Sequence, residues 1–391
     1  MLVKQQITRL ITSILASLIL AAVTAGCAGA PAAQDTPSQN GQSPQNGQSP
    51  RSRAPTDDVS VDTAHADNSA TYLFTDSSGR TVELPRDIQR IAPSGALSQL
   101  VLYTLCPDKL VGLSGRFEDA QHSFIDEKYT SLPVFGNLYA ETLNLESLML
   151  AAPQIIIDIG PVSPTAAEDM DSIQDRTGIP TIFVHMEIDS MGDAYASLGE
   201  ITGETVQAGM LIDYIEQTLA GTARLVGTIP ESERVTVYFA QDDGLTAIVS
   251  GVIHSDVIDF VGGINVAVVE QSLKGGASMI SMEQLMLWDP DVVLFSPESI
   301  YDSVESVAQW SGLGAIVSGR FYEIPGAPYN WMGRPPSINR ILGIKWLSNL
   351  LYPDVFRYDM IAEAQEFFRL FYHVDATDLE IRTILANSTF K

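Results

Sequence analysis

An aromatic-rich loop late in the chain has the residue types of a small-molecule binding site. Tyr329, Trp331 and Met332 lie among several glycines and prolines, which favour a loop over a helix. Aromatic walls with a few polar groups are typical of clefts that hold small molecules, although the same side chains could pack as core. Arg334 follows them, and its guanidinium could grip a carboxylate in bidentate fashion or simply pair with a nearby acid.

Three residues from earlier in the chain could contribute to the same site. Arg116 is a second candidate cation, although Glu118 and Asp119 beside it offer ordinary ion pairs. Tyr139 lies in a predicted loop, and His254 directly precedes a predicted helix start. A loop histidine can ligate a metal or merely form hydrogen bonds. The other histidines show no metal-ligand spacing, so we expect no resident metal ion.

The chain lacks the short motifs that mark common catalytic and nucleotide sites. It contains no G-x-x-x-x-G-K-[ST] loop for phosphates, no G-x-S-x-G nucleophile elbow and no H-E-x-x-H metal helix. Beyond its first residues it has no apolar stretch long enough to span a membrane. We therefore expect no catalytic residue, no cofactor and no membrane-embedded channel.

The charge balance excludes further classes of protein. The chain has 22 Lys and Arg against 48 Asp and Glu, a formal net charge of −26. This sign argues against nucleic acid as a partner and against docking on an anionic membrane through a basic face. Hydrophobic residues make up 45% of the chain, enough for a folded core. Two cysteines are too few for a disulfide scaffold.

The first 70 residues predict a signal peptide followed by a tether. Residues 1–27 predict a lipoprotein signal peptide, because two cations precede a short apolar run and TAGC resembles the bacterial lipobox. Cys27 would carry the lipid; ordinary signal cleavage is the alternative. Residues 28–70 lack apolar periodicity and contain QNGQSP twice, which predicts a disordered tether.

Strand-like and helix-like segments alternate from residue 71 onward, which predicts an α/β fold. One helix-to-strand unit occurs twice: residues 145–157 and 282–294 share the pattern Glu-x-Leu-Met-Leu-x-x-Pro followed by an apolar run. A capping Asn or Ser precedes each copy. Glu146 and Glu283 therefore fall in the first turns of equivalent short helices, where an acid is favoured by ~0.3–1 kcal/mol.

The repeat predicts two similar α/β lobes. We place them at residues 71–192 and 231–391, joined by a long helix over 193–230 that is interrupted near its start by glycines. Aromatic residues at helical spacing between 362 and 372 are expected to be core.

Three segments resemble signature stretches of the substrate-binding proteins of ferric-siderophore, haem and cobalamin ABC importers. Residues 75–85 read TDSSGRTVELP, residues 89–93 read QRIAP and residues 260–267 read FVGGINVA. The resemblance covers about residues 72–355, with the motifs in the order typical of that family. Residues 329–336 depart from the family pattern because they are richer in aromatics and proline.

This resemblance implies an extracytoplasmic binding protein with a ligand cleft between its two lobes. It would capture a metal chelate, a ferric siderophore first and haem or cobalamin as alternatives, and deliver it to a permease dimer and its ATPase without a chemical step. We expect a monomer held on the cell membrane by its lipid. In that family, one glutamate on each lobe pairs with arginines of the permease dimer. The resemblance assigns this docking role to Glu146 and Glu283. The expected ligand contacts are Arg116, Tyr139, His254, Tyr329, Trp331, Met332 and Arg334.

Two readings from other classes stay open at this point. A lipoprotein enzyme acting outside the cell would need a nucleophile–base pair or a metal cluster, and the sequence suggests neither. A sensor subunit that feeds a signalling partner would share the fold and the cleft.

Overall fold

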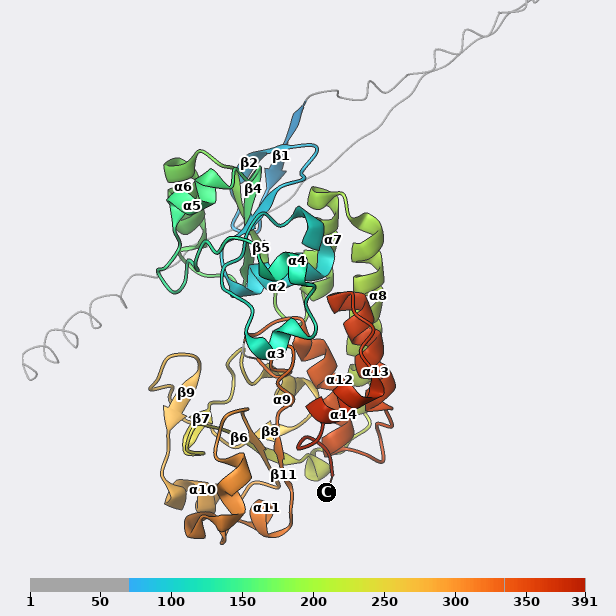
Figure 1. Cartoon of the computed structure of the whole chain (residues 1–391). Coiled ribbons are helices and arrows are strands. Elements are labelled where there is room, and N and C mark those ends of the chain that lie inside the picture. The colour runs from blue at the N-terminus through green and yellow to red at the C-terminus, as the bar shows by residue number, and fades with distance from the viewer. Residues whose placement is uncertain (1–69, 334, 391) are drawn as a thin grey trace, which may run out of the picture. The chain divides into compact units, whose positions relative to one another are not determined.

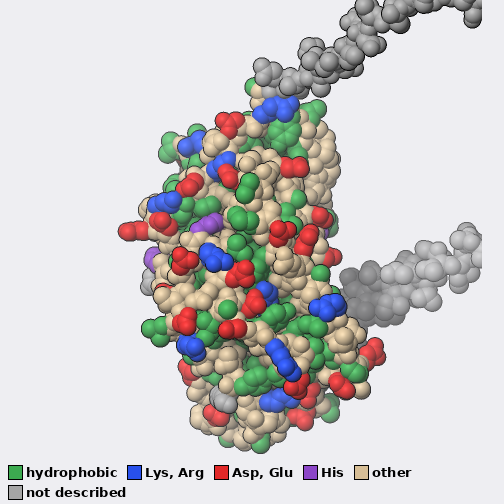
Figure 2. All heavy atoms as spheres, turned by 90° about the vertical axis from the view of Figure 1, so that its right-hand side faces the viewer, with side chains coloured by type: hydrophobic (Ala, Val, Ile, Leu, Met, Phe, Trp, Pro, Cys, Tyr) green, Lys and Arg blue, Asp and Glu red, His purple; other side chains and the backbone are tan. Residues whose placement is uncertain are grey.

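A computed structural model describes residues 70–333 and 335–390 of the chain. The predicted signal peptide, Cys27 and nearly all of the tether lie outside the described residues, as does Arg334. Within those ranges no helix combines the length and the apolar character needed to cross a membrane. Figure 2 shows acidic, basic and hydrophobic side chains interspersed over one face of the molecule rather than gathered by sign.

The first lobe is built on a parallel sheet of order β3-β4-β5 (Figure 1). All six residues of the central strand β4 are buried, which agrees with its nearly continuous apolar sequence. A short antiparallel hairpin, β1-β2, precedes this sheet. The elements are β1 (Thr71–Thr75), β2 (Thr81–Pro85), β3 (Ile91–Pro93), α2 (Ala96–Leu105), α3 (Asp119–His122), α4 (Glu127–Thr130), α5 (Leu145–Leu150), β4 (Ile155–Gly160), α6 (Ala166–Thr177) and β5 (Thr181–His185).

The second lobe repeats this plan with a larger sheet. Its strands β11, β10 and β6 are parallel, with β10 in the middle, and β7 and β9 extend the sheet in antiparallel fashion. The elements are β6 (Thr236–Gln241), β7 (Thr246–Ile248), α9 (Asp256–Phe260), β8 (Ile264–Asn265), β9 (Ala277–Met279), α10 (Met282–Trp288), β10 (Val292–Phe295), α11 (Gly314–Val317) and β11 (Phe321–Glu323).

A pair of helices occupies the segment that joins the lobes. The helix α7 (Met191–Thr202) ends at Gly203, whose left-handed backbone (φ 78°) caps it, and α8 (Thr205–Val226) then runs to the second lobe. The two helices pack closely, since a Cβ on Gly199 would lie 2.6 Å from the Cβ of Ala208. The long connecting helix is therefore α8, and the interruption expected from the glycines is the turn at Gly203.

The C-terminal segment packs against both α8 and the first lobe. It consists of α12 (Asn339–Leu351), α13 (Met360–Phe367), a π-helical turn over 368–372 and α14 (Asp378–Ile384). The aromatic residues of 367–372 are buried, as predicted, and the rings of Tyr103 and Tyr372 lie 6.3 Å apart. The lobes are thus held by this C-terminal packing as well as by α8.

The apolar segment 110–113 predicts a strand that the described residues do not form. Leu110 and Leu113, the ends of that prediction, form only isolated bridges, with Ile91 and Val134. The segment follows a tight turn over 107–109, so it meets the sheet at single points instead of running along it.

Gly343 in α12 lies against the backbone of the aromatic loop. A Cβ at this position would lie 1.9 Å from the carbonyl oxygen of Trp331. We expect Gly343→Ala to destabilise the protein by roughly 1–3 kcal/mol through overpacking, although helix propensity alone favours Ala by about 1 kcal/mol. Urea unfolding of the full chain tests this. Gly209→Ala in α8, where a Cβ meets open space, is the control expected to be neutral or stabilising.

Candidate ligand-binding site and docking surfaces

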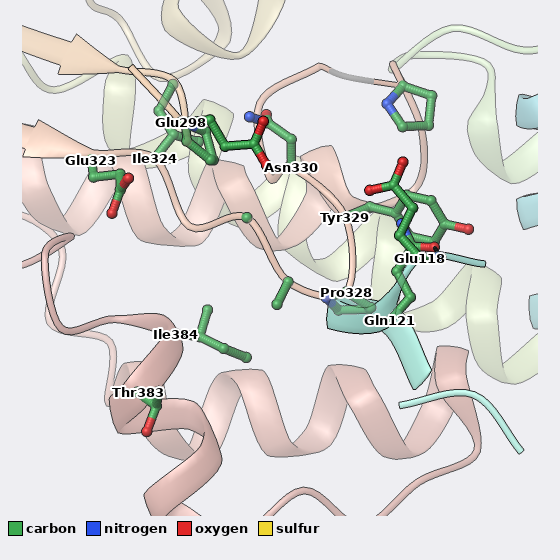
Figure 3. A pocket seen from close by; sticks show the side chains of 14 residues that line it. Glu118, Gln121, Glu298, Glu323, Ile324, Pro328, Tyr329, Asn330, Thr383 and Ile384 are labelled. Atoms are coloured by element: carbon green, nitrogen blue, oxygen red, sulfur yellow. Dashed lines mark hydrogen bonds between the residues drawn. The ribbon is translucent and has the colours of Figure 1, made fainter. Parts of the chain in front are cut away.

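A cavity of about 550 Å³ lies where the loops after β10 and β11 face α3 of the first lobe (Figure 3). Ligands of open α/β sheets bind beyond the carboxyl ends of the strands, and this cavity has that position in the second lobe. The lining residues are Glu118, Gln121, Pro297, Glu298, Glu323, Ile324, Gly326, Ala327, Pro328, Tyr329, Asn330, Pro335, Thr383 and Ile384.

The described wall of the cavity is acidic. Glu118, Glu298 and Glu323 contribute carboxylates, and none of the lining residues that the structure describes is Lys, Arg or His. Glu323 accepts a hydrogen bond from Asn387 at 3.0 Å, while the Glu118 carboxylate caps α3. Burial raises the pKa of the Tyr329 hydroxyl, and the charge of Glu118 raises it further. In Figure 3 Glu118 and Tyr329 lie side by side at the cavity. A bound molecule would therefore meet negative charge and a neutral phenol.

Local hydrogen bonds fix the aromatic loop after β11. The side-chain oxygen of Asn330 accepts from the backbone N–H groups of Met332 (2.8 Å) and Gly333 (3.1 Å). The indole N–H of Trp331 donates to the Ala327 carbonyl at 3.0 Å. This arrangement turns Tyr329 toward the cavity and directs Trp331 inward.

Trp331 and Met332 do not line the cavity in this structure. Both side chains are 0% exposed and belong to the main hydrophobic core. The expectation that they form an aromatic ligand wall is therefore corrected: the loop sequence shows that they are apolar, but α12 packs close against this segment and buries them. Tyr329 is the predicted aromatic that lines the cavity.

A second polar cluster lies at the carboxyl end of β4. Asp158 is fully buried and accepts hydrogen bonds from the hydroxyls of Tyr139 (2.5 Å) and Ser94. Burial raises the pKa of the Asp158 carboxyl, the two hydroxyls oppose that change, and Asp169 adds to it. Tyr139 as a whole is 62% exposed, although its hydroxyl is held by Asp158.

Asp158 and Ser94 were not among the predicted site residues. The sequence does contain a signal for Asp158, because this residue is the one polar residue in the strand IIIDIG and stands near the strand's carboxyl end. A buried carboxylate in such a strand needs donors. The sequence does not show that a loop tyrosine supplies one of them.

Arg116, Tyr139 and His254 are not among the described residues that line the cavity. Arg116 is exposed. The Nδ1–H of His254 donates to the Gly333 carbonyl at 2.5 Å, so the histidine connects the aromatic loop to the start of α9. Across residues 70–333 and 335–390, no cluster of three His, Cys, Asp or Glu side chains is placed to hold a metal ion.

The repeated helices α5 and α10 have matching local structure. Asn144 caps α5 by accepting from the Ser147 N–H, and Ser281 caps α10 by accepting from the Gln284 N–H. Each helix leads into the central strand of its parallel sheet, β4 or β10. Glu146 and Glu283 are exposed in the two first turns.

Neither of these glutamates forms an ion pair with another described residue. Hydrogen bonding at the start of α10 lowers the pKa of the Glu283 carboxyl, so it is ionised at neutral pH. The two helices thus present equivalent acidic side chains to solvent, one from each lobe.

Comparisons with known proteins agree with the fold. A family model described as periplasmic binding protein matches residues 118–328, more than half of the chain. An ABC transporter solute binding protein from Sulfurospirillum deleyianum is 27% identical, with a TM-score of 0.75 over 80% of this chain and 99% of that one. No curated protein was found to match the chain.

Two further solved structures share the fold at lower identity. The molybdate periplasmic binding protein MolA of Haemophilus influenzae is 20% identical, with a TM-score of 0.65 over 78% of this chain and 99% of that one. CeuE of Helicobacter pylori, solved as a Ni-His complex, is 15% identical, with a TM-score of 0.61 over 82% and 100%. Because the matched region exceeds half of the chain, the chain belongs to the periplasmic binding protein family, the extracytoplasmic solute-binding components of ABC importers.

Proposed function

We propose that this protein captures a metal chelate, a ferric siderophore first, and delivers it to the permease of an ABC importer. The observation that carries the proposal is the cavity at the carboxyl ends of β10 and β11, which α3 of the first lobe helps to enclose. Its volume of about 550 Å³ lies within the range of pockets for small organic ligands. Binding and delivery need no chemical step, so the protein has no catalytic role.

The acidic lining of the cavity favours some classes of metal chelate over others. Among the described lining residues the carboxylates have no cationic partner, which disfavours an anionic ligand, because bringing like charges together costs free energy. A tris-hydroxamate complex of ferric iron is neutral, or cationic when it carries an amine, whereas a tris-catecholate complex is strongly anionic. The cavity therefore supports a hydroxamate-type chelate. Among tetrapyrroles, the propionates of haem make it a poorer fit than cobalamin, which stays the alternative.

The test is a titration of the full chain by calorimetry. The panel contains a cationic and a neutral ferric tris-hydroxamate, a ferric tris-catecholate, haem, cobalamin and molybdate. We expect saturable binding of a tris-hydroxamate. Tight binding of the tris-catecholate or of molybdate alone would contradict the assignment, and binding of cobalamin alone would favour the alternative.

Removing one acidic side chain from the cavity should weaken its preference for a cationic over a neutral chelate. We expect Glu298→Gln to weaken binding of the cationic tris-hydroxamate roughly two- to fivefold and to leave the neutral one nearly unchanged, as for a solvent-accessible charge pair. Raising the salt concentration should shrink the difference. Glu231→Gln removes an exposed acid that is not in the cavity lining and serves as the matched control. Equal effects of the two substitutions would argue against a role for the cavity charge.

A further inference from the structure

The helices α5 and α10 each expose a leucine one turn after their glutamate. Leu150 is 88% exposed and Leu287 is 79% exposed. Each lies four residues after its glutamate, so the two side chains share one helix face. Single exposed apolar residues are common on protein surfaces and do not by themselves indicate a binding site. Here the same exposed pair, an acid and a leucine, occurs at the same two positions of the internal repeat.

The backbone around the two pairs is also equivalent. Leu148 and Leu285, between the paired residues, are both 0% exposed and anchor their helices to the lobes. At equivalent positions just after the two helices stand Ala152 and Asp289, two non-glycine residues with positive φ (45° and 39°). A proline and the central strand follow each time. Matching caps, anchors and ends mean that each lobe presents its Glu–Leu pair in the same local frame.

These features select one kind of partner. Two equivalent patches on a single chain fit a partner that offers the same surface twice, as a two-fold symmetric dimer does. An unpaired carboxylate beside an apolar side chain fits a surface with a cation next to an apolar recess. Anionic lipid or a second copy of this chain would place negative charge against these carboxylates. In Figure 1 both helices lie on the left-hand side, one in each lobe, away from α8.

We propose that Leu150 and Leu287 are the apolar halves of two equivalent docking patches, each burying its leucine in one subunit of the permease dimer. The inference rests on the proposed delivery function and extends it. The glutamates supply the charge that selects and orients the partner. The leucines supply desolvated contact area, which mainly slows dissociation.

The experiment measures binding of the full chain to its cognate permease–ATPase complex, held in nanodiscs. The variants are Leu150→Ser, Leu287→Ser and the double variant, with Leu150→Met as a conservative check. We expect each single Ser variant to bind about tenfold more weakly through faster dissociation, the double variant more weakly still, and the Met variant nearly normally. Leu379→Ser is the matched control, since Leu379 is 74% exposed on α14 but lies outside the repeat.

Chelate affinity, measured in parallel, must stay unchanged in every variant, because neither leucine lines the cavity. Wild-type binding of the permease by the double Ser variant would overturn the leucine proposal while leaving delivery intact. Weakening by Leu379→Ser to the same extent would also overturn it. Failure of the unmodified protein to bind the permease, with or without chelate, would overturn both the leucine proposal and the delivery function.

Discussion

Uptake by the double variant Glu146→Lys, Glu283→Lys should fall at least about a hundredfold, because close interfacial charge pairs contribute roughly 1.5 kcal/mol or more each and reversal replaces attraction by repulsion. Both side chains are exposed in first turns, one in each lobe, and neither forms an ion pair with another described residue. Their charge is therefore available to a permease. Chelate affinity should not change, since neither residue lines the cavity. Uptake of radiolabelled chelate in cells and calorimetry on the purified protein measure the two quantities.

If Glu146 and Glu283 served only to stabilise their helices, a different result would be expected. An acid in a first turn interacts favourably with the helix dipole, so charge reversal there would lower stability slightly in any helix. Glu168→Lys provides the control, because Glu168 is an exposed first-turn acid of α6 with no counterpart in the repeat. It should leave uptake intact. Normal uptake by the double Lys variant would refute docking through these residues.

The second large effect concerns a buried ion pair between α9 and α12. The guanidinium of Arg340 is 0% exposed and contacts the carboxylate of Asp256, whose side chain is 29% exposed. We expect Asp256→Ala to destabilise the protein by about 3–5 kcal/mol, because it leaves a buried positive charge without its partner. Chemical unfolding of the full chain at neutral pH measures this. Asp108→Ala removes the acid of an exposed pair with Lys128 and should cost no more than about 1 kcal/mol.

The same pair predicts how stability depends on pH. Burial raises the pKa of the Asp256 carboxyl to about 6, although Arg340 opposes that rise. The unfolded value is about 3.9, so the native state holds this proton more tightly than the unfolded state does. The contribution of Asp256 to stability therefore falls as pH rises from about 4 to about 6 and is flat outside that window.

Asp256→Ala should remove this part of the pH profile, whereas Asp108→Ala should retain it. The double variant Asp256→Ala, Arg340→Met should recover most of the lost stability, since apolar replacement of a buried pair is often neutral or better. A destabilisation by Asp256→Ala no larger than that by Asp108→Ala would show that the pair does not matter to the fold.

Most of the secondary structure follows from short-range signals in the sequence. The buried strand β4 follows from a run of isoleucines, and the ends of α5 and α10 follow from capping residues and prolines a few positions apart. These effects act within one or two turns, so a sequence contains them in full. The same locality explains why the repeat could be found, and with it the equivalent positions of Glu146 and Glu283 and the two-lobed α/β fold.

The candidate ligand site depended on contacts between distant parts of the chain. Tyr329 and Trp331 are both aromatic residues of one loop, yet one lines the cavity and the other is buried, because α12 approaches the loop so closely at Gly343. The acidic wall likewise combines Glu118 with residues more than a hundred positions away.

The chain alone therefore determined most of the segments that form helices and strands, the equivalent positions of Glu146 and Glu283 and the class of protein. Only the tertiary structure decided which loop residues face the cavity, what charge surrounds it and that Tyr139 and Ser94 satisfy Asp158. The physical reason is that burial and polar pairing are properties of residues brought together by packing, and residue type and periodicity do not specify those neighbours.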